Sequence, residues 1–197
     1  EGKPEVADWV TKWQTEHGFT YRTEIFSRAV DNLNQPIKLP TRYNALYDGY
    51  LESEYKDDIK FAVLFCGINS NTLGGMDDFK KNFVPYFIEY FFKQPNYLTK
   101  DNMPVMFMYG AQEFVNVLGG MDKANEALAY LDEECKKAGF DGFIMVADGQ
   151  SNGFISSVSQ FGKGYTYAYG MLYESRNSES QLKTNDTYFA TSDNVVG

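Results

Sequence analysis

Short apolar runs recur about every 40 residues along this chain, and a helical pattern fills each gap between them. This rhythm favours right-handed strand–helix–strand crossovers and a parallel sheet. The runs FAVLF and GFIMV do not alternate between apolar and polar residues, which is typical of strands covered on both faces. We therefore predict five strands: Phe19–Phe26, Ile59–Cys66, Pro104–Met108, Phe140–Ala147 and Tyr165–Leu172.

Two of the helices are predicted to end in the same way. A helix at Val6–His17 is followed by Gly18, and a helix at Met121–Ala138 is followed by Gly139. Glycine in this position commonly caps a helix C-terminus, so we expect the same turn between helix and strand at both places. Asp122 is a possible N-cap of the second helix. The first helix is predicted from the apolar spacing of Val6, Trp9, Val10 and Trp13.

The middle of the chain contains two further predicted helices. One spans about Tyr43–Ser53, and the other is an aromatic helix that contains Pro85. Because proline removes a backbone hydrogen bond, we expect either a kink at Pro85 or a break near Asn82 with Pro85 in the first turn of a second segment. The aromatic helix is predicted from the spacing of Phe79, Phe83, Phe87, Tyr90 and Phe91.

Two architectures fit this order of elements, an open parallel α/β sheet and a (β/α)8 TIM barrel. The sequence contains neither GxGxxG nor GxxxxGK[ST], and the pairs Gly74-Gly75 and Gly119-Gly120 are interpreted as loops before helices. A complete barrel needs eight strands and about 250 residues. We therefore expect one domain at residues 1–197, formed by about five consecutive β/α units of a larger barrel, with a polar tail or lid at 175–197.

Composition and charge argue against several classes of partner. A formal net charge of -9 disfavours nucleic acid, and the apolar runs are too short for membrane insertion. His17 is the only histidine, which argues against His-rich zinc sites and His-based triads, and its position suits a cation at a helix C-terminus. The acidic cluster at residues 52–58 lacks EF-hand spacing and is interpreted as a solvated face, so we expect neither metal nor cofactor. Cys66 and Cys135 are predicted to be buried thiols.

Residues 83–109 resemble a known family. The segments 85–87 (PYF), 91–98 (FFKQPNYL) and 101–105 (DNMPV), followed by Tyr109, are similar to the pattern "yFk.p.Yl...gkPv..iY" of glycosyltransferase WbsX-like proteins and of glycoside hydrolase family 99. Upstream, residues 60–71 (KFAVLFCGINSN) resemble the family's "kFal.WaNeNw" strand end. Asn69 and Asn71 match this pattern, whereas Gly67 replaces the usual Trp and Ser70 replaces Glu. The similarity covers about Val6 to Asp148.

This resemblance implies a barrel that acts on an oligosaccharide or polysaccharide. It also implies catalytic carboxylates in a "wNEw.E" motif, which does not occur in the 197 residues, so we expect the catalytic pair to lie outside this chain. Glycoside hydrolysis is the first hypothesis. Glycosyl transfer in surface polysaccharide synthesis and a non-catalytic carbohydrate-binding barrel are the alternatives. A hydrolase would favour a periplasmic, cell-surface or secreted location.

Glycoside hydrolysis needs two carboxyl groups, and in barrels these follow the strands. Asp148 directly follows a predicted strand and is the candidate carboxylate, with a role in catalysis or in sugar binding and a turn-forming role as the alternative. Glu24, Asp31 and Glu113 are weaker candidates, and Glu113 is expected to begin a helix. The predicted substrate-binding residues are Asn69, Asn71, Tyr109, Asp148 and Gln150.

Overall fold

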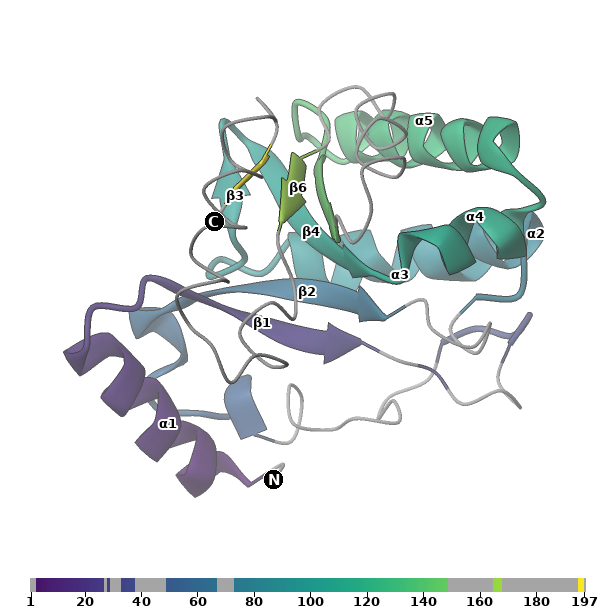
Figure 1. Ribbon diagram of the computed structural model, residues 1–197. Coiled ribbons are helices and arrows are strands. Elements are labelled where there is room, and N and C mark those ends of the chain that lie inside the picture. Colours follow the sequence, from purple (N-terminus) through teal and green to yellow (C-terminus); the bar gives the residue numbers. More distant parts are fainter. Residues whose placement is uncertain are drawn as a thin grey trace, which may run out of the picture.

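A parallel sheet forms the centre of the molecule in the computed structural model, which describes residues 3–26, 28, 33–37, 49–66, 73–148, 165–167 and 195–196 (Figure 1). Its hydrogen-bonded order is β1-β2-β4-β5-β6-β7, and the short β3 (Thr99–Lys100) pairs antiparallel with β4. The parallel strands are β1 (Tyr21–Phe26), β2 (Lys60–Cys66), β4 (Met103–Tyr109), β5 (Ile144–Asp148), β6 (Tyr165–Tyr167) and β7 (Val195–Val196).

The order of the strands distinguishes between the two predicted architectures. Each new parallel strand is added at the same edge of the growing sheet, from β1 through to β7. A doubly wound sheet reverses its order at a switch point, whereas a (β/α)8 barrel winds in one direction. The chain therefore folds as consecutive β/α units of a barrel, as predicted. The described strand β7 lies within residues 175–197, the segment predicted as a polar tail or lid.

The helices lie in two places around this sheet. Figure 1 shows α2 to α5 together on one side, whereas α1 lies apart from them beside β1. A short 3-10 helix, η3 (Lys56–Asp58), precedes β2. The other helical elements are α1 (Pro4–Glu16), α2 (Met76–Asp78), η5 (Phe79–Phe83), α3 (Val84–Phe87), η6 (Ile88–Phe92), α4 (Ala111–Leu118) and α5 (Met121–Lys137).

The two predicted helix–strand turns have the same geometry. After α1, the N–H of Gly18 donates to the carbonyl of Thr15 and the N–H of Phe19 to Gln14, with Gly18 at φ 81°. After α5, the N–H of Gly139 donates to the carbonyl of Lys136 and the N–H of Phe140 to that of Cys135, with Gly139 at φ 98°. Both are Schellman motifs, in which glycine adopts the left-handed conformation at little cost.

Some predicted boundaries were wrong. The strand predicted at Phe140–Ala147 begins four residues later, at Ile144, because residues 139–143 form the turn. Helix α5 starts at Met121 after Gly120, so Asp122 occupies the first helical turn and is not the N-cap. The strand predicted at Tyr165–Leu172 is present at Tyr165–Tyr167, and its remainder lies outside the described residues. Most of the helix predicted at Tyr43–Ser53 also lies outside them.

The aromatic helix continues through Pro85. Elements α2, η5, α3 and η6 follow one another without a gap, and η5 and η6 have π-helical hydrogen bonding. The N–H of Val84, for example, donates to the carbonyl of Phe79, five residues back. Pro85 then occupies the first turn of α3, where its missing N–H removes no bond from that segment. The helix therefore accommodates the proline by widening the preceding turn.

The core lies between this helix and the sheet. The ring centroids of Phe83 and Phe87 are 3.9 Å apart, and Phe26 of β1 meets Phe87 edge-on at 4.8 Å. The hydroxyl of Tyr97 donates to the carbonyl of Val105 at 2.8 Å, which satisfies its polar group inside the core. The Phe-rich composition is thus used mainly for packing in the described core.

Candidate functional site

Four strands end at the same rim of the sheet. The β2–β4 register pairs Cys66 with Tyr109, and the β5–β6 register pairs Asp148 with Tyr167. Since the β4–β5 register pairs Met108 with Ala147, Tyr109 and Asp148 end their strands at the same level. This is the carboxyl-terminal edge of a parallel sheet, where barrel enzymes place their chemistry. We call residues Cys66, Tyr109, Asp148 and Tyr167 the rim row.

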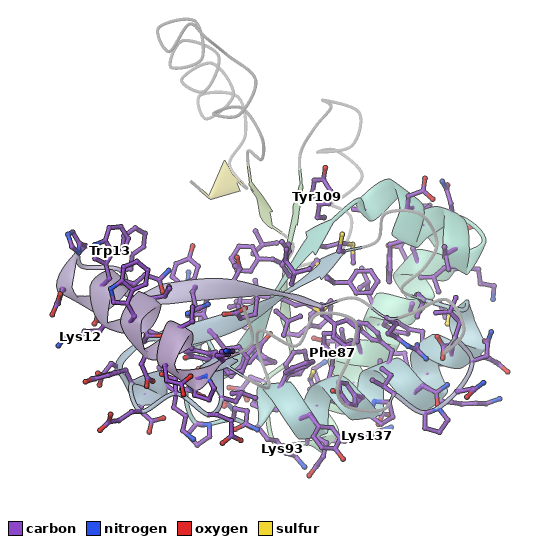
Figure 2. The ribbon with its side chains drawn as sticks, turned by 90° about the horizontal axis from the view of Figure 1, so that it is seen from below. Lys12, Trp13, Phe87, Lys93, Tyr109 and Lys137 are labelled. Atoms are coloured by element: carbon purple, nitrogen blue, oxygen red, sulfur yellow. The ribbon has the colours of Figure 1, made fainter. Side chains whose placement is uncertain are left out.

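Tyr109 faces the inside of the barrel. In β1, Glu24 and Phe26 are buried against the helical side, and Tyr21 lies on the opposite face, where its ring stacks on Phe107 at a centroid distance of 6.1 Å. Tyr109 is two residues beyond Phe107 in the same strand and therefore shares this inner face. Figure 2 places half-buried Tyr109 at the rim, far from Phe87 in the helical layer.

The structure places the other predicted site residues only in part. Asp148 was predicted to follow a strand that ends at Ala147, and it is instead the last residue of β5. Its position in the rim row comes from the backbone register. Asn69, Asn71 and Gln150 lie outside the described residues. The two described residues of the predicted set, Tyr109 and Asp148, are therefore brought to one edge of the sheet.

A buried ion pair between Arg28 and Asp78 connects the loops behind this edge. It was not predicted from the sequence. Arg28 follows β1 and Asp78 ends α2, which follows β2, so the pair connects two loops on the carboxyl-terminal side. The Asp78 carboxylate also accepts hydrogen bonds from the backbone N–H of Gly74 at 2.9 Å and of Asn34 at 3.1 Å, and from Nδ2 of Asn82 at 2.7 Å. With its oxygens occupied in this way, Asp78 is suited to positioning and not to acid–base chemistry. The one signal for this pair in the sequence is the position of Asp78, a carboxylate in the first turn of an apolar helix.

Glu24 is excluded as a rim carboxylate by its orientation. Its side chain is 8% exposed, contacts Arg22 and lies on the helical side of β1. Burial raises the pKa of Glu24, and the charge and hydrogen bond of Arg22 oppose that shift. Glu113 occupies the first turn of α4, the structural role predicted for it, and Asp31 lies outside the described residues.

The remaining titratable candidates have local structural roles. Nδ1 of His17 lies 2.7 Å from the carbonyl oxygen of Trp13 at the end of α1. The centroids of the His17 imidazole and the Trp13 indole are 4.5 Å apart. Glu52 and Asp57 of the acidic cluster are exposed, as predicted. Cys135 is buried, but Cys66 is half-buried because it ends β2 at the rim. Among the described residues, no group of three or more His, Cys, Asp or Glu side chains could hold a metal ion.

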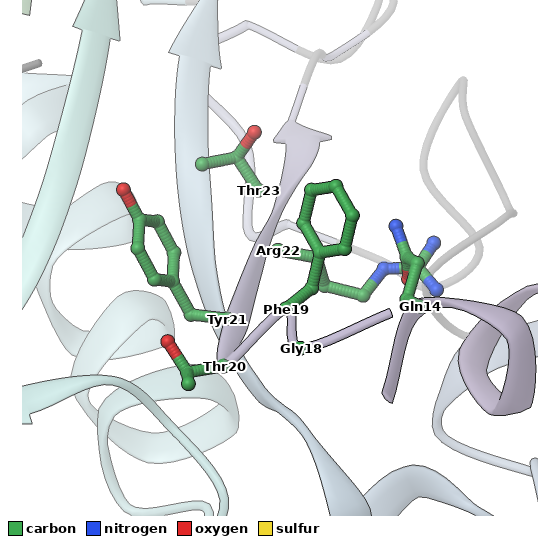
Figure 3. Close-up of a pocket in the computed structure, with 7 residues that line it drawn as sticks. All are labelled: Gln14, Gly18, Phe19, Thr20, Tyr21, Arg22 and Thr23. Atoms are coloured by element: carbon green, nitrogen blue, oxygen red, sulfur yellow. The ribbon is translucent and has the colours of Figure 1, made fainter. Parts of the chain in front are cut away.

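An open pocket of about 570 Å³ lies away from the rim row, beside the start of β1. Figure 3 shows Tyr21 and Thr23 on one side of the strand, with Arg22 and Gln14 on the other. The pocket is at the amino-terminal end of the strand, which in barrels serves stability and not catalysis. It is therefore a separate feature from the candidate site. Its lining residues are Gln14, Gly18, Phe19, Thr20, Tyr21, Arg22 and Thr23.

Comparison with solved structures defines the class of fold, which is that of a β/α barrel. The chain is similar to the GH99 endo-α-mannosidase from Bacteroides thetaiotaomicron, with a TM-score of 0.58 and 8% sequence identity over 99% of this chain and 52% of that one. A second structure of that enzyme, in complex with bis-tris-propane, gives a TM-score of 0.56 and 10% identity over 99% and 55%. The chain thus spans about half the length of the enzyme that it resembles. The predicted relation to family 99 is confirmed as a distant likeness of fold.

Comparisons at the level of sequence add no relative. No family model matches this chain. No curated protein matches it either. In the described part of the chain, no helix is long and apolar enough to cross a membrane.

Proposed function

We propose that this chain is part of a carbohydrate-active barrel enzyme that hydrolyses glycosidic bonds. The observation that carries the proposal is the rim row, in which Tyr109 on the inner face and Asp148 end adjacent strands at the carboxyl-terminal edge. The similarity in fold to an endo-α-mannosidase supports the same class of substrate. Carbohydrate is also consistent with an acidic chain, because neutral sugars are not repelled by a net charge of -9.

Each residue of the site would have a distinct role. The Tyr109 ring offers an apolar surface on which a sugar ring can stack. Asp148 would supply one carboxylate, either as a hydrogen-bond acceptor for sugar hydroxyls or as one of the two acid–base groups. Asn69, Asn71 and Gln150 would donate and accept hydrogen bonds with further hydroxyls.

The finer proposal concerns the substrate and the family. We propose an α-linked mannose-containing glycan, by analogy with the solved endo-α-mannosidase. The relation to WbsX-like proteins stays part of this proposal and rests on the motif at residues 85–109. We further propose that residues 1–197 form one domain within the larger barrel. Fold alone does not fix function, so the reaction has to be tested at the site.

The test is donor-free release of reducing sugar from a panel of α- and β-linked glycans by the complete polypeptide that carries this chain. We expect release from an α-mannoside, and we expect Asp148→Asn to lower the rate by about 10²-fold or more if the carboxylate acts in catalysis. Asp141→Asn is the matched control, since Asp141 is exposed and precedes the same strand. Release that requires an added sugar donor would favour glycosyl transfer, and binding without release would favour a non-catalytic barrel.

A further inference from the structure

Asp78 accepts four hydrogen bonds from the described residues, although it is only 1% exposed. Its Oδ2 accepts from Nη1 of Arg28 at 2.6 Å and from the backbone N–H of Gly74 at 2.9 Å. Its Oδ1 accepts from the backbone N–H of Asn34 at 3.1 Å and from Nδ2 of Asn82 at 2.7 Å. Each carboxylate oxygen therefore serves two donors. We call Asp78 and these donors the Asp78 cluster.

The Asp78 cluster connects the segments that leave two neighbouring strands. Arg28 and Asn34 follow β1, whereas Gly74 follows β2 and precedes α2. Arg28 also donates from Nη2 to the carbonyl of Gln35 at 2.9 Å, so its guanidinium joins Asp78 to the segment after β1. The donors of Asn34 and Gly74 are backbone N–H groups. The cluster therefore fixes the path of the chain after each strand, and not only the conformations of side chains.

Aromatic packing extends this arrangement to β4. Phe79 directly follows Asp78, and its ring meets that of Phe114 in α4 at a centroid distance of 5.9 Å. Phe65 of β2 meets the same ring at 6.0 Å. Helix α4 begins two residues after Tyr109, and Figure 1 shows it in the same layer as α2. The helical segment that carries Asp78 therefore contacts elements that are directly connected to the rim row.

We infer that Asp78 is a positioning residue of the proposed sugar site, which holds the segments after β1 and β2 in the arrangement that binds the sugar. The inference rests on the proposed function, because it assigns these segments to a carbohydrate site. Asn69 and Asn71 belong to the connection between Cys66, which ends β2 in the rim row, and Gly74, which donates to Asp78. Fixing both ends of this short connection restricts its conformations, so less entropy is lost when sugar binds.

Two substitutions break the Asp78 cluster to different degrees. Asp78→Asn keeps the size of the side chain, but in either orientation its NH2 group would face two hydrogen-bond donors. Arg28→Lys is milder, because it leaves a positive charge opposite Asp78. A lysine ammonium lacks the planar fork that joins Asp78 to the carbonyl of Gln35, so this variant releases mainly the segment after β1.

The first test is alkylation of the two cysteines by iodoacetamide in the complete polypeptide, read for each cysteine by mass spectrometry. Cys66 is half-buried at the rim, and release of the chain that follows it should speed its alkylation by about fivefold or more in Asp78→Asn. Cys135 is the internal reference, because it is buried in α5 and burial raises the pKa of its thiol to about 12. Its rate should not change.

Arg28→Lys decides the outcome if Asp78→Asn unfolds the protein as a whole. In this milder variant Cys66 should again be alkylated faster than in the wild type, by a smaller factor, while Cys135 stays protected. Unchanged alkylation of Cys66 in both variants would overturn the inference. Equal acceleration at Cys66 and Cys135 in both variants would also overturn it, since Asp78 would then stabilise the whole fold and not the segments at the rim.

The second test is isothermal titration of the same proteins with an α-mannose-containing oligosaccharide. Asp78→Asn should weaken binding by about tenfold, and Arg28→Lys by less, because the segments at the rim are no longer held in place before sugar binds. Asp77→Asn is the matched control and should bind as the wild type does, since Asp77 is exposed. If the wild type binds and a folded Asp78→Asn binds equally tightly, the inference fails and the proposed function stands. Absence of binding by the wild type would instead overturn the proposed function and, with it, the role assigned to Asp78.

Discussion

Nη1 of Arg28 lies 2.6 Å from Oδ2 of Asp78, and neither side chain is more than 2% exposed. Arg28 also donates from Nη2 to the backbone carbonyl of Gln35 at 2.9 Å. The pair therefore connects the chain that leaves β1 with the helix that follows β2. Both segments lie on the carboxyl-terminal side of the sheet. The pair therefore holds together two of the segments that follow the strands on the side where the rim row lies.

Asp78→Asn should destabilise the fold by about 3–5 kcal/mol, because it removes one charge of a buried pair and leaves the other without its carboxylate. The substitution conserves volume, so packing should change little. Urea denaturation measures the free energy of unfolding. The control is Asp77→Asn at the neighbouring residue, whose ion pair with Lys81 is exposed, and it should have no measurable effect. Similar losses for the two variants would argue against a special role for the buried pair.

Phe87→Ala should cost about 3–5 kcal/mol of unfolding free energy, because it opens a cavity in the aromatic core. Phe87 is fully buried and its ring packs against Phe26, Phe83 and Phe91. The exposed Tyr90→Ala provides the comparison on the same helix and should cost far less. If the two costs were equal under the same urea titration, the core would not be centred on this helix.

Gly142→Ala should destabilise the protein more than Gly139→Ala. Both glycines have positive φ angles, of 136° and 98°, so each substitution carries backbone strain of about 1–2 kcal/mol. A Cβ at position 142 would also lie 2.5 Å from Oδ1 of Asp132, whereas position 139 has open space. Asp132 accepts the N–H of Phe143 through that atom, so the clash also disturbs the start of β5. Thermal melts of the two variants should rank in this order, and the reverse ranking would contradict the turn geometry.

Glu24→Gln should make the fold less sensitive to rising pH. Burial raises the pKa of Glu24 in the folded state, so that state holds the proton more tightly than the unfolded chain does. The contribution of Glu24 to stability is therefore present at low pH and is lost as pH rises above the ordinary value of 4.5. The unfolding free energy of the variant minus that of the wild type should increase from pH 4.5 to 7. A difference that falls over this range would show that pairing with Arg22 outweighs burial.

Much of the fold could be predicted from the sequence. The continuous apolar strands, the regular spacing and the two capping glycines indicated parallel β/α units, and the structure places Gly18 and Gly139 in identical turns. The order of strands could not be predicted from spacing, because open sheets and barrels share the same local pattern and differ in winding direction. Sheet topology made that distinction.

The candidate site was less predictable. Tyr109 and Asp148 could be placed at strand ends, because periodicity locates the ends of apolar runs. Their adjacency depends on the register between β4 and β5, which no local pattern encodes. The Arg28–Asp78 pair was missed for a similar reason, since its partners are 50 residues apart and are joined by tertiary packing. The exposure of Trp9 and Trp13 was also hidden, because a helical stripe does not specify what covers it.

Oligosaccharide binding at the rim row tests the central claim most directly. Isothermal titration of the complete polypeptide with an α-mannose-containing oligosaccharide should give saturable binding, and Tyr109→Ala should weaken it by about tenfold or more through loss of a stacking surface. Asp148→Asn should weaken it as well, whereas Tyr90→Ala and Asp141→Asn should leave it unchanged. If all four variants bound the oligosaccharide as tightly as the wild type, the rim row would not be the carbohydrate site.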